Sequence, residues 1–383
     1  MNFGTASIAN NGNTIVGIGS IKSIKTALIE LGLKRPLICT DPGIAKIKLI
    51  DKLLQEIPKK TKYILFSNTP ANPTEVAVKE ATNIFKKYNC DGIICFGGGS
   101  SIDLGKATAL CCTHAEPLEH YITQNDGAKK IGPVVPIIAI PTTAGTGSEV
   151  ARACVIILEN GKKRIIASPH LVPKTAILDP NLTLMLPPML TAATGMDAIS
   201  HCIEAILSPI INPSAEAIGM NGIEQALGQK ALINAYTDGG DISARMTMLI
   251  VSTQGAMAFS KGLGAVHAMS HACGKNQKLG LHHGTLNAVL LPTVLEYNEV
   301  NTKSKYERIS SAIGLNAKTP LPQYFRDLNQ SLELPPNLKS LGITKDMVQD
   351  LAHHAAEDMT SITNPVKMNE EKYCELFAKA LNE

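Results

Sequence analysis

The chain has 383 residues, two to three times the usual size of one domain, so we expect two domains. Hydrophobic residues make up 44% of the sequence and charged residues 18%, which indicates a globular protein rather than a disordered one. The formal net charge of +3 is spread over the whole length, aromatic residues make up 4%, and tryptophan is absent. With neither a basic patch nor a set of stacking aromatics, the sequence predicts that nucleic acid is not a partner.

The sequence also argues against a membrane or secreted protein. Its longest apolar runs, such as residues 134–140, are far shorter than a membrane span, and its first residues lack the pattern of a signal peptide. Nine cysteines are scattered without a CxxC pair or a regular framework. Because unpaired thiols are typical of a reducing compartment, we expect a cytoplasmic protein without a membrane partner.

The first half of the chain alternates strand-like and helix-like segments. Short apolar, β-branched runs bounded by turn residues predict strands at residues 36–40, 62–66, 92–96 and 134–141, with helices at 43–56 and 74–88 between them. This alternation predicts an α/β domain with a mostly parallel sheet and helices on its faces.

The second half contains helical patterns and no convincing strand. The change falls near Leu186-Pro187-Pro188, so we predict an α/β domain over residues 1–187 and an all-helical domain over 188–383. The helices of the second domain are expected at residues 189–207, 213–236, 242–261, 265–276, 284–298, 345–357 and 369–381.

A glycine-rich loop follows the strand expected at residues 92–96. Gly97, Gly98, Gly99 and Ser100 stand between that strand and a helix, where backbone amides can approach a phosphate closely. A plain tight turn is the alternative. Residues 139–150, "AIPTTAGTGSEV", lead from another strand into a second loop of small hydrogen-bond donors. Asp41 ends an earlier strand, where it can accept a hydrogen bond from the ribose 2′-OH of NAD or simply form a turn or helix cap.

The helical half concentrates candidate metal ligands. Asp197 and His201 lie four residues apart on one helix face, and His267 and His271 repeat this spacing, with His282 and His283 farther along. Burying such groups among apolar neighbours is costly unless they pair, and a mixed nitrogen and oxygen set suits Fe²⁺ or Zn²⁺. Histidines satisfied within a protein core are the alternative. Glu204 is either a partner of this group or an ordinary surface carboxylate.

Five segments in this order resemble the signatures of the iron-containing (group III) alcohol dehydrogenases: GGGSSIDLGK, PTTAGTGSE, TAATGMDAISHCIEA, KGLGAVHAMSHACG and HHGTLNAVLLP. The resemblance covers roughly residues 10–370. It implies a dehydroquinate synthase-like fold, in which a Rossmann-like N-terminal domain binds NAD(P), a helical C-terminal domain binds the metal, and catalysis takes place in the cleft between them.

The resemblance also assigns residues. It implies that the metal ligands are Asp197, His201, His267 and His283. It places His271 near the substrate, where this histidine can relay a proton or merely pack beside the site. An extra His282 and a slightly longer segment after Gly274 leave open which histidine is the fourth ligand. The implied dinucleotide contacts are Asp41, Asn72, Gly97, Gly98, Gly99, Ser100, Asp103, Thr142, Thr143 and Lys163.

The expected activity is hydride transfer between NAD and a small primary alcohol or its aldehyde, with the metal as Lewis acid. The wording of three motifs is similar to 4-hydroxybutyrate dehydrogenases, and Lys261, Lys275 and Lys278 are candidate partners for a substrate carboxylate. A lactaldehyde-type reductase, a maleylacetate-reductase-like enzyme, a lyase resembling dehydroquinate synthase and a filament-forming scaffold are the alternatives. We also expect a homodimer or a larger homo-oligomer.

Overall fold

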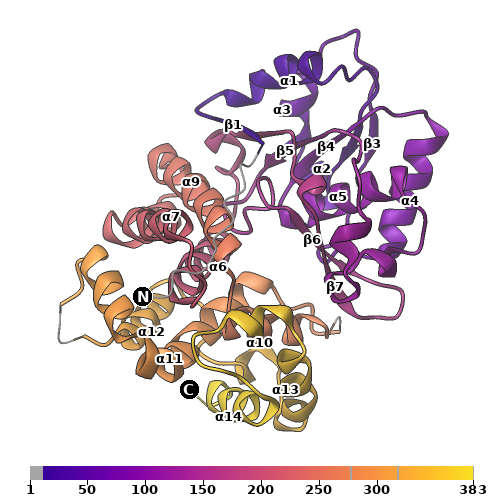
Figure 1. Cartoon of the computed structure of the whole chain (residues 1–383). Coiled ribbons are helices and arrows are strands. Elements are labelled where there is room, and N and C mark those ends of the chain that lie inside the picture. The colour runs from indigo at the N-terminus through magenta and orange to yellow at the C-terminus, as the bar shows by residue number, and fades with distance from the viewer. Residues whose placement is uncertain (1–11, 277, 317–318, 383) are drawn as a thin grey trace. The chain divides into compact units, whose positions relative to one another are not determined.

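The computed structural model describes residues 12–276, 278–316 and 319–382. It contains two compact units, one formed by residues 12–143 and 147–185 and the other by 144–146 together with the described residues from 186 onward. Figure 1 colours the first unit mainly indigo to magenta and the second mainly salmon to yellow. The division falls between Met185 and Leu186, close to the predicted boundary after residue 187. Residues 1–11, with which the first predicted domain begins, lie outside the described part.

The first unit is built on a six-stranded parallel sheet in the order β1-β8-β5-β4-β2-β3. Its strands are β1 (Asn13–Val16), β2 (Leu37–Cys39), β3 (Ile64–Phe66), β4 (Ile93–Gly97), β5 (Ile137–Pro141) and β8 (Thr175–Leu178). Its helices are α1 (Ile24–Glu30), α2 (Pro42–Lys46), α3 (Ile50–Leu54), α4 (Glu75–Lys87) and α5 (Gly99–Thr113). An antiparallel pair, β6 (Ala153–Ile157) and β7 (Lys163–Ala167), forms a separate small sheet.

The alternation of side chains along each strand explains why both faces of the sheet are covered. In β4, Ile93 and Cys95 join a core cluster with residues of α4 and α5, whereas Ile94 and Phe96 join one with residues of α1, α2 and α3. Successive side chains of a strand point to opposite faces, so an apolar strand requires an apolar layer on each side. The predicted α/β domain with a mostly parallel sheet is therefore confirmed.

Several elements differ from those predicted. The strands β1, β6, β7 and β8 were not predicted. Strands β1 and β7 mix polar with apolar residues and so lack the continuous apolar run that marks β4 and β5. The single helix expected at residues 43–56 is wrong. The chain instead forms α2 and α3, separated at Lys48, whose φ of 56° lies in the left-handed region and ends the first helix.

The second unit is helical, and its described residues contain no strand, as predicted. Its helices are α6 (Pro188–Leu207), α7 (Pro213–Ile223), α8 (Ala231–Thr237), α9 (Ile242–Ala258), α10 (Ala265–Gly274), α11 (His283–Ala312), α12 (Leu321–Ser331), α13 (Val348–Ala356) and α14 (Glu370–Ala380). The predicted helix at residues 213–236 is interrupted by a short π-helical segment at Glu224–Gly228, and α12 was not predicted. None of the described helices combines the length and apolar character needed to cross a bilayer.

Candidate active site

Helix α6 presents three ionisable side chains to the interior of the helical unit. Asp197, His201 and Glu204 are 2%, 5% and 4% exposed, although almost all of their neighbours on this helix are apolar or small. Their spacing of four and three residues brings them onto one helix face. The three polar side chains therefore point into the same part of the helical unit, where one group can interact with all of them.

Two later helices contribute imidazoles to the same point. Nε2 of His267 on α10 lies 3.7 Å from Oδ1 of Asp197, and Nε2 of His283 at the start of α11 lies 3.6 Å from the same oxygen. Nε2 of His201 lies 3.8 Å from it. Gly284 allows α11 to approach, because a Cβ at this position would lie 2.1 Å from the carbonyl oxygen of Ala193 on α6.

The spacing of these donor atoms fits a metal ion. In a tetrahedral site the ligand atoms are separated by about 1.6 times the bond length, so bonds of about 2.0–2.2 Å place them roughly 3.3–3.6 Å apart. The three distances from Asp197 Oδ1 are close to this range, and the candidate ligand atoms of Asp197, His201 and His267 all lie within 4.8 Å of one another. One carboxylate and several imidazoles form a donor set suited to Fe²⁺ or Zn²⁺.

Charge reinforces this fit. Burial alone would raise the pKa of Asp197, but the imidazoles of His201, His267 and His283 hold it well below its usual range. Burial lowers the pKa of His201 to about 4. Burial would also lower the pKa of His267, but its contacts with Asp197 and Glu204 outweigh burial and raise that pKa to about 9. A cation that binds here would therefore meet an ionised Asp197 carboxylate, which attracts it.

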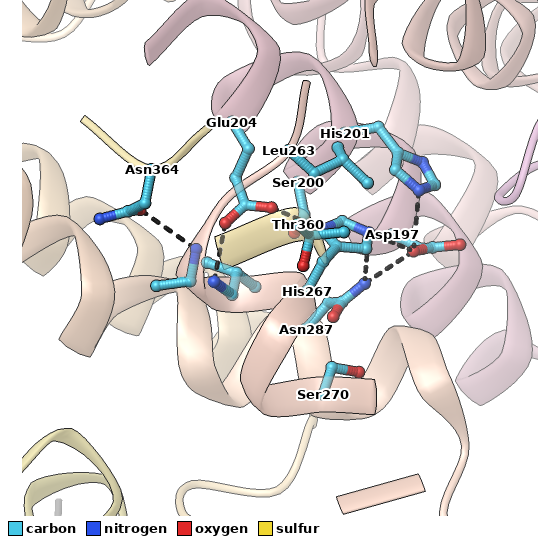
Figure 2. A network of polar contacts seen from close by, with 12 residues as sticks. Asp197, Ser200, His201, Glu204, Leu263, His267, Ser270, Asn287, Thr360 and Asn364 are labelled. Atoms are coloured by element: carbon cyan, nitrogen blue, oxygen red, sulfur yellow. Dashed lines mark hydrogen bonds and ion pairs between the residues drawn. The ribbon is translucent and has the colours of Figure 1, made fainter. Parts of the chain in front are cut away.

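Further side chains fix the orientation of the imidazoles (Figure 2). Nδ1 of His267 lies 2.6 Å from Oε2 of Glu204, whose other oxygen accepts a hydrogen bond of 2.7 Å from the backbone N–H of Val266. Nδ1 of His283 lies 2.8 Å from the hydroxyl of Ser270. Each interaction leaves Nε2 directed at the Asp197 carboxylate, which is the usual way in which proteins orient metal-binding histidines.

The two remaining histidines differ in position. His282, which directly precedes α11, is exposed, whereas Nε2 of His283 faces Asp197. The ring of His271 stacks on that of His283 at a centroid distance of 5.3 Å, and its Nδ1 lies 3.0 Å from Oδ2 of Asp358. The exposure of His282 and the direction of Nε2 of His283 favour His283 as the histidine that joins Asp197, His201 and His267. His271 lies beside this set.

Sequence reasoning missed four residues of this region. Asn287 contacts Asp197, Asp358 contacts His271, and Asn364 with Asn298 anchors the start of α10 through the N–H of Ala265. Only Asn287, one turn after His283 on the same helix, had a signal in its spacing. Asn298 lies farther along α11, and Asp358 and Asn364 come from segments distant in sequence.

The expected role of Lys261 in binding a substrate carboxylate is wrong. This lysine is 3% exposed, and its Nζ donates hydrogen bonds to the carbonyl oxygens of Ile206 and Ser208 and to Glu216. It therefore caps the end of α6. Lys275 contacts His354 and lies 3.8 Å from Asp350, while Lys278 is exposed.

The glycine loop of the first unit lies where strand order reverses. Strand β2 lies between β3 and β4 in the sheet. The chain runs from β2 to β3 on one side of β2 and then returns to β4 on its other side, so the carboxyl ends of the parallel strands β2 and β4 are neighbours. Ligands of open parallel sheets bind at such a point. At Gly97, with φ of 155°, a Cβ would lie 2.5 Å from Oγ of Ser101 and 3.3 Å from Oδ2 of Asp41. Only glycine fits there.

The structure brings the predicted loop residues together in pairs. The N–H of Thr142 donates to the carbonyl of Gly97, Oγ of Ser100 donates to the carbonyl of Ala71, and Nζ of Lys163 donates to Oδ1 of Asn72 at 3.2 Å. Within the described part of the chain, no side-chain cap bond is formed at Gly98, the N-cap of α5, so this helix start suits the binding of a phosphate.

Asp41 has a structural role that the sequence also allowed. It is the N-cap of α2, and its Oδ1 accepts a hydrogen bond of 3.0 Å from the N–H of Ile44. Its Oδ2 is the oxygen that faces Gly97. The cap and a coenzyme contact are therefore compatible, because they use different oxygens of the same carboxylate.

Asp103 and Lys106 brace the second loop. The carboxylate of Asp103 accepts hydrogen bonds from Oγ of Ser148 at 2.6 Å and from the N–H of Val155 at 2.9 Å. Nζ of the fully buried Lys106 donates to the carbonyl oxygens of Ser148, Ala151 and Ala153. Burial lowers the pKa of Lys106, although Asp103 opposes this shift. Asp103 thus positions the loop, and its direct contact with a dinucleotide stays a prediction.

Comparison with known proteins places both units in one family. The model of iron-containing alcohol dehydrogenases matches residues 11–180, and that of the C-terminal domain of the Fe-containing alcohol dehydrogenase family matches residues 191–381. The chain is 41% identical over 371 residues to a 4-hydroxybutyrate dehydrogenase of Cupriavidus necator, covering 95% of this chain and 96% of the relative.

Solved structures agree with this result. A 1,3-propanediol oxidoreductase matches with a TM-score of 0.91 and 32% identity over 98% of this chain and 100% of its own. The sulfoacetaldehyde reductase of Bifidobacterium kashiwanohense, solved with NAD⁺, matches with a TM-score of 0.88 and 25% identity over 99% and 100%. The chain therefore belongs to the iron-containing alcohol dehydrogenase family, whose members use NAD and Fe²⁺, and it is an oxidoreductase that acts on alcohols.

Proposed function

We propose that the protein interconverts 4-hydroxybutyrate and succinate semialdehyde, with transfer of a hydride between the substrate carbon and NAD. The relative from Cupriavidus necator supports this substrate, because it is similar to the chain over almost the whole length of both proteins. Substrate changes readily within a fold, so the activity on alcohols follows from the family, whereas the particular alcohol is what we propose.

The ligand set carries the proposal. Asp197, His201, His267 and His283 come from three helices, and the three imidazoles each direct Nε2 to within 3.6–3.8 Å of one carboxylate oxygen. We infer that these four residues hold Fe²⁺, with Zn²⁺ as the alternative. His283 rather than His282 is the fourth member, because His282 is exposed.

The bound cation supplies Lewis-acid polarisation of the substrate oxygen. The protein supplies orientation and proton transfer. Glu204 and Ser270 hold the rings of His267 and His283, so the donor atoms need no rearrangement when substrate binds. His271, held by Asp358, stands next to His283 and carries the alcohol proton toward solvent.

The coenzyme is held by the loops of the first unit. Gly97, Gly98, Gly99 and Ser100 offer backbone amides to the pyrophosphate, and Thr142 and Thr143 flank them. Lys163 and Asn72 act as a pair, and Asp41 accepts from the adenosine ribose. The NAD⁺ found in the related sulfoacetaldehyde reductase supports this choice of coenzyme.

A substrate panel tests the proposal. With Fe²⁺-loaded protein and NAD, we expect kcat/KM for 4-hydroxybutyrate to exceed that for 1-butanol by roughly tenfold or more, since a bound carboxylate adds at least about 1.4 kcal/mol to transition-state binding. The two substrates have the same carbon chain, so the comparison isolates the carboxylate. Initial rates of NADH formation provide the measurement, and 1,3-propanediol is the third member of the panel.

The outcomes separate the levels of the proposal. Equal kcat/KM for the acid and the plain alcohol would overturn the hydroxy-acid substrate but leave alcohol oxidation intact. A preference for 1,3-propanediol would place the enzyme with the propanediol oxidoreductases. No NADH from any of the three alcohols would contradict the proposed reaction.

Compartment and assembly complete the proposal. We place the enzyme in the cytoplasm, because all nine cysteines are free thiols and seven of them are buried. We also propose a homodimer or a larger homo-oligomer. Strand β1 is an edge strand of the sheet, where Val16 is 48% exposed and the following Ile18 is 66% exposed. An apolar sheet edge of this kind can pair with a second copy of the chain.

A further inference from the structure

Asn287 is a fully buried side chain that touches the proposed ligand set. It lies one turn after His283 on α11. Its Nδ2 is 2.8 Å from Oδ1 of Asp197, 3.2 Å from Nε2 of His267 and 3.3 Å from Nε2 of His283. In Figure 2 the ring of His201 reaches the Asp197 carboxylate from one side and the amide of Asn287 reaches it from the other.

The orientation of this amide is fixed by its neighbours. The carboxylate of Asp197 can only accept hydrogen bonds, so it selects the NH₂ end of Asn287. The other end, Oδ1, is buried and has no hydrogen-bond partner among the residues that the structure describes. The nitrogen of a carboxamide is a poor metal ligand, because its lone pair is delocalised into the carbonyl. Asn287 therefore contacts three donor groups without being able to replace one.

A nitrogen within 3.3 Å of three donor atoms covers the face that these atoms form. We propose that Asn287 is a non-ligating cover over the face formed by Asp197, His267 and His283, which keeps water off this side of the ion. This inference rests on the ligand set proposed above. It makes Asn287 a positioning residue that acts through the coordination sphere.

The cover has a chemical purpose. A catalytic metal needs one open position for the reacting oxygen. A second open position would admit water, which would raise the coordination number and weaken the polarisation of the substrate. By closing one face, Asn287 directs an exogenous oxygen to another face of the ion.

Cobalt substitution tests this role without relying on activity. The visible d–d absorption of bound Co²⁺ reports coordination number, since a four-coordinate ion absorbs more strongly than one with additional ligands. We expect Asn287→Ala to admit water and to lower the molar absorbance by roughly twofold or more. Asn287→Leu should retain the wild-type spectrum, because leucine fills a similar volume without a donor. Asn287→Ser opens the same face of the ligand set but keeps a side chain that can hydrogen-bond. This variant replaces Asn287→Ala if the alanine variant fails to fold.

Asn329→Ala is the matched control. Asn329 is also a buried amide, and its Oδ1 has no hydrogen-bond partner among the described residues. Its Nδ2 donates to the carbonyl oxygen of Ala288 rather than to a proposed ligand. Its spectrum should equal that of the wild type. An unchanged spectrum in the opened Asn287 variants, or an equal change in Asn329→Ala, would overturn the cover. If Co²⁺ added to the wild-type protein shows the same absorption as free Co²⁺, the proposed ligand set itself would be overturned.

Discussion

Replacing His267 with alanine is expected to lower kcat/KM for alcohol oxidation by roughly a thousandfold or more. The side chain is 1% exposed and is one of the four donors that face a common point. A Lewis-acid metal supplies several kcal/mol of transition-state stabilisation, and about 4 kcal/mol corresponds to a thousandfold in rate. Loss of this donor also leaves the buried Glu204 carboxylate without its imidazole partner. Metal content and steady-state rates measured on the same sample provide the test.

A second variant distinguishes the role of His267 as a ligand from the role of Glu204, which orients the His267 ring. Glu204→Gln keeps the shape of the side chain but removes the charge next to Nδ1 of His267. Changes to such outer partners typically cost roughly 10–100-fold in metal affinity or activity. We therefore expect this variant to retain more activity than His267→Ala. Full activity in His267→Ala with an intact metal content would show that this histidine is not a ligand.

Asp41 is expected to give the enzyme a preference for NAD over NADP of about thirtyfold, equivalent to ~2 kcal/mol. Its Oδ2 faces Gly97 beside the phosphate loop, where a negative charge accepts from a ribose 2′-OH and repels a 2′-phosphate. Asp41→Asn should bring the ratio of kcat/KM values close to one. Asparagine is the appropriate replacement, because it caps a helix as well as aspartate does and so preserves the bond to Ile44.

Asp51→Asn serves as the control for this experiment. Asp51 is an exposed aspartate on α3 in the same unit, and its replacement changes the net charge by the same amount. The coenzyme ratio should remain at the wild-type value in this variant. A wild-type preference for NADP, or an unchanged ratio in Asp41→Asn, would contradict the assigned role of Asp41.

The sequence was sufficient to predict the features that depend on local pattern. The apolar strands around Ile94 and Ile138, the glycine loop after β4 and the paired Asp197 and His201 all follow from spacing along one segment. The buried α6 helix could be recognised because its polar residues stand out against apolar neighbours. The fold class was therefore predictable, as was the proximity of Asp197 and His201 within the helical unit.

The remaining features depend on contacts between distant segments. Asp358 is 87 residues from His271, and no local pattern relates the two positions. Lys261 lies beside the metal-binding segment in sequence, but tertiary packing directs its ammonium group to the end of α6. The break at Lys48 depends on a left-handed backbone conformation that lysine seldom adopts. In each case tertiary structure overrides the local preference.

We propose that one metal ion, held by Asp197, His201, His267 and His283, is required for NAD-linked alcohol oxidation. Anaerobic titration of metal-free protein with Fe²⁺ tests it most directly, with bound iron and NADH formation followed together. We expect the rate to rise in proportion to bound iron and to stop rising at one ion per chain. Full activity in the metal-free protein, or a rate that does not depend on bound iron, would contradict the claim.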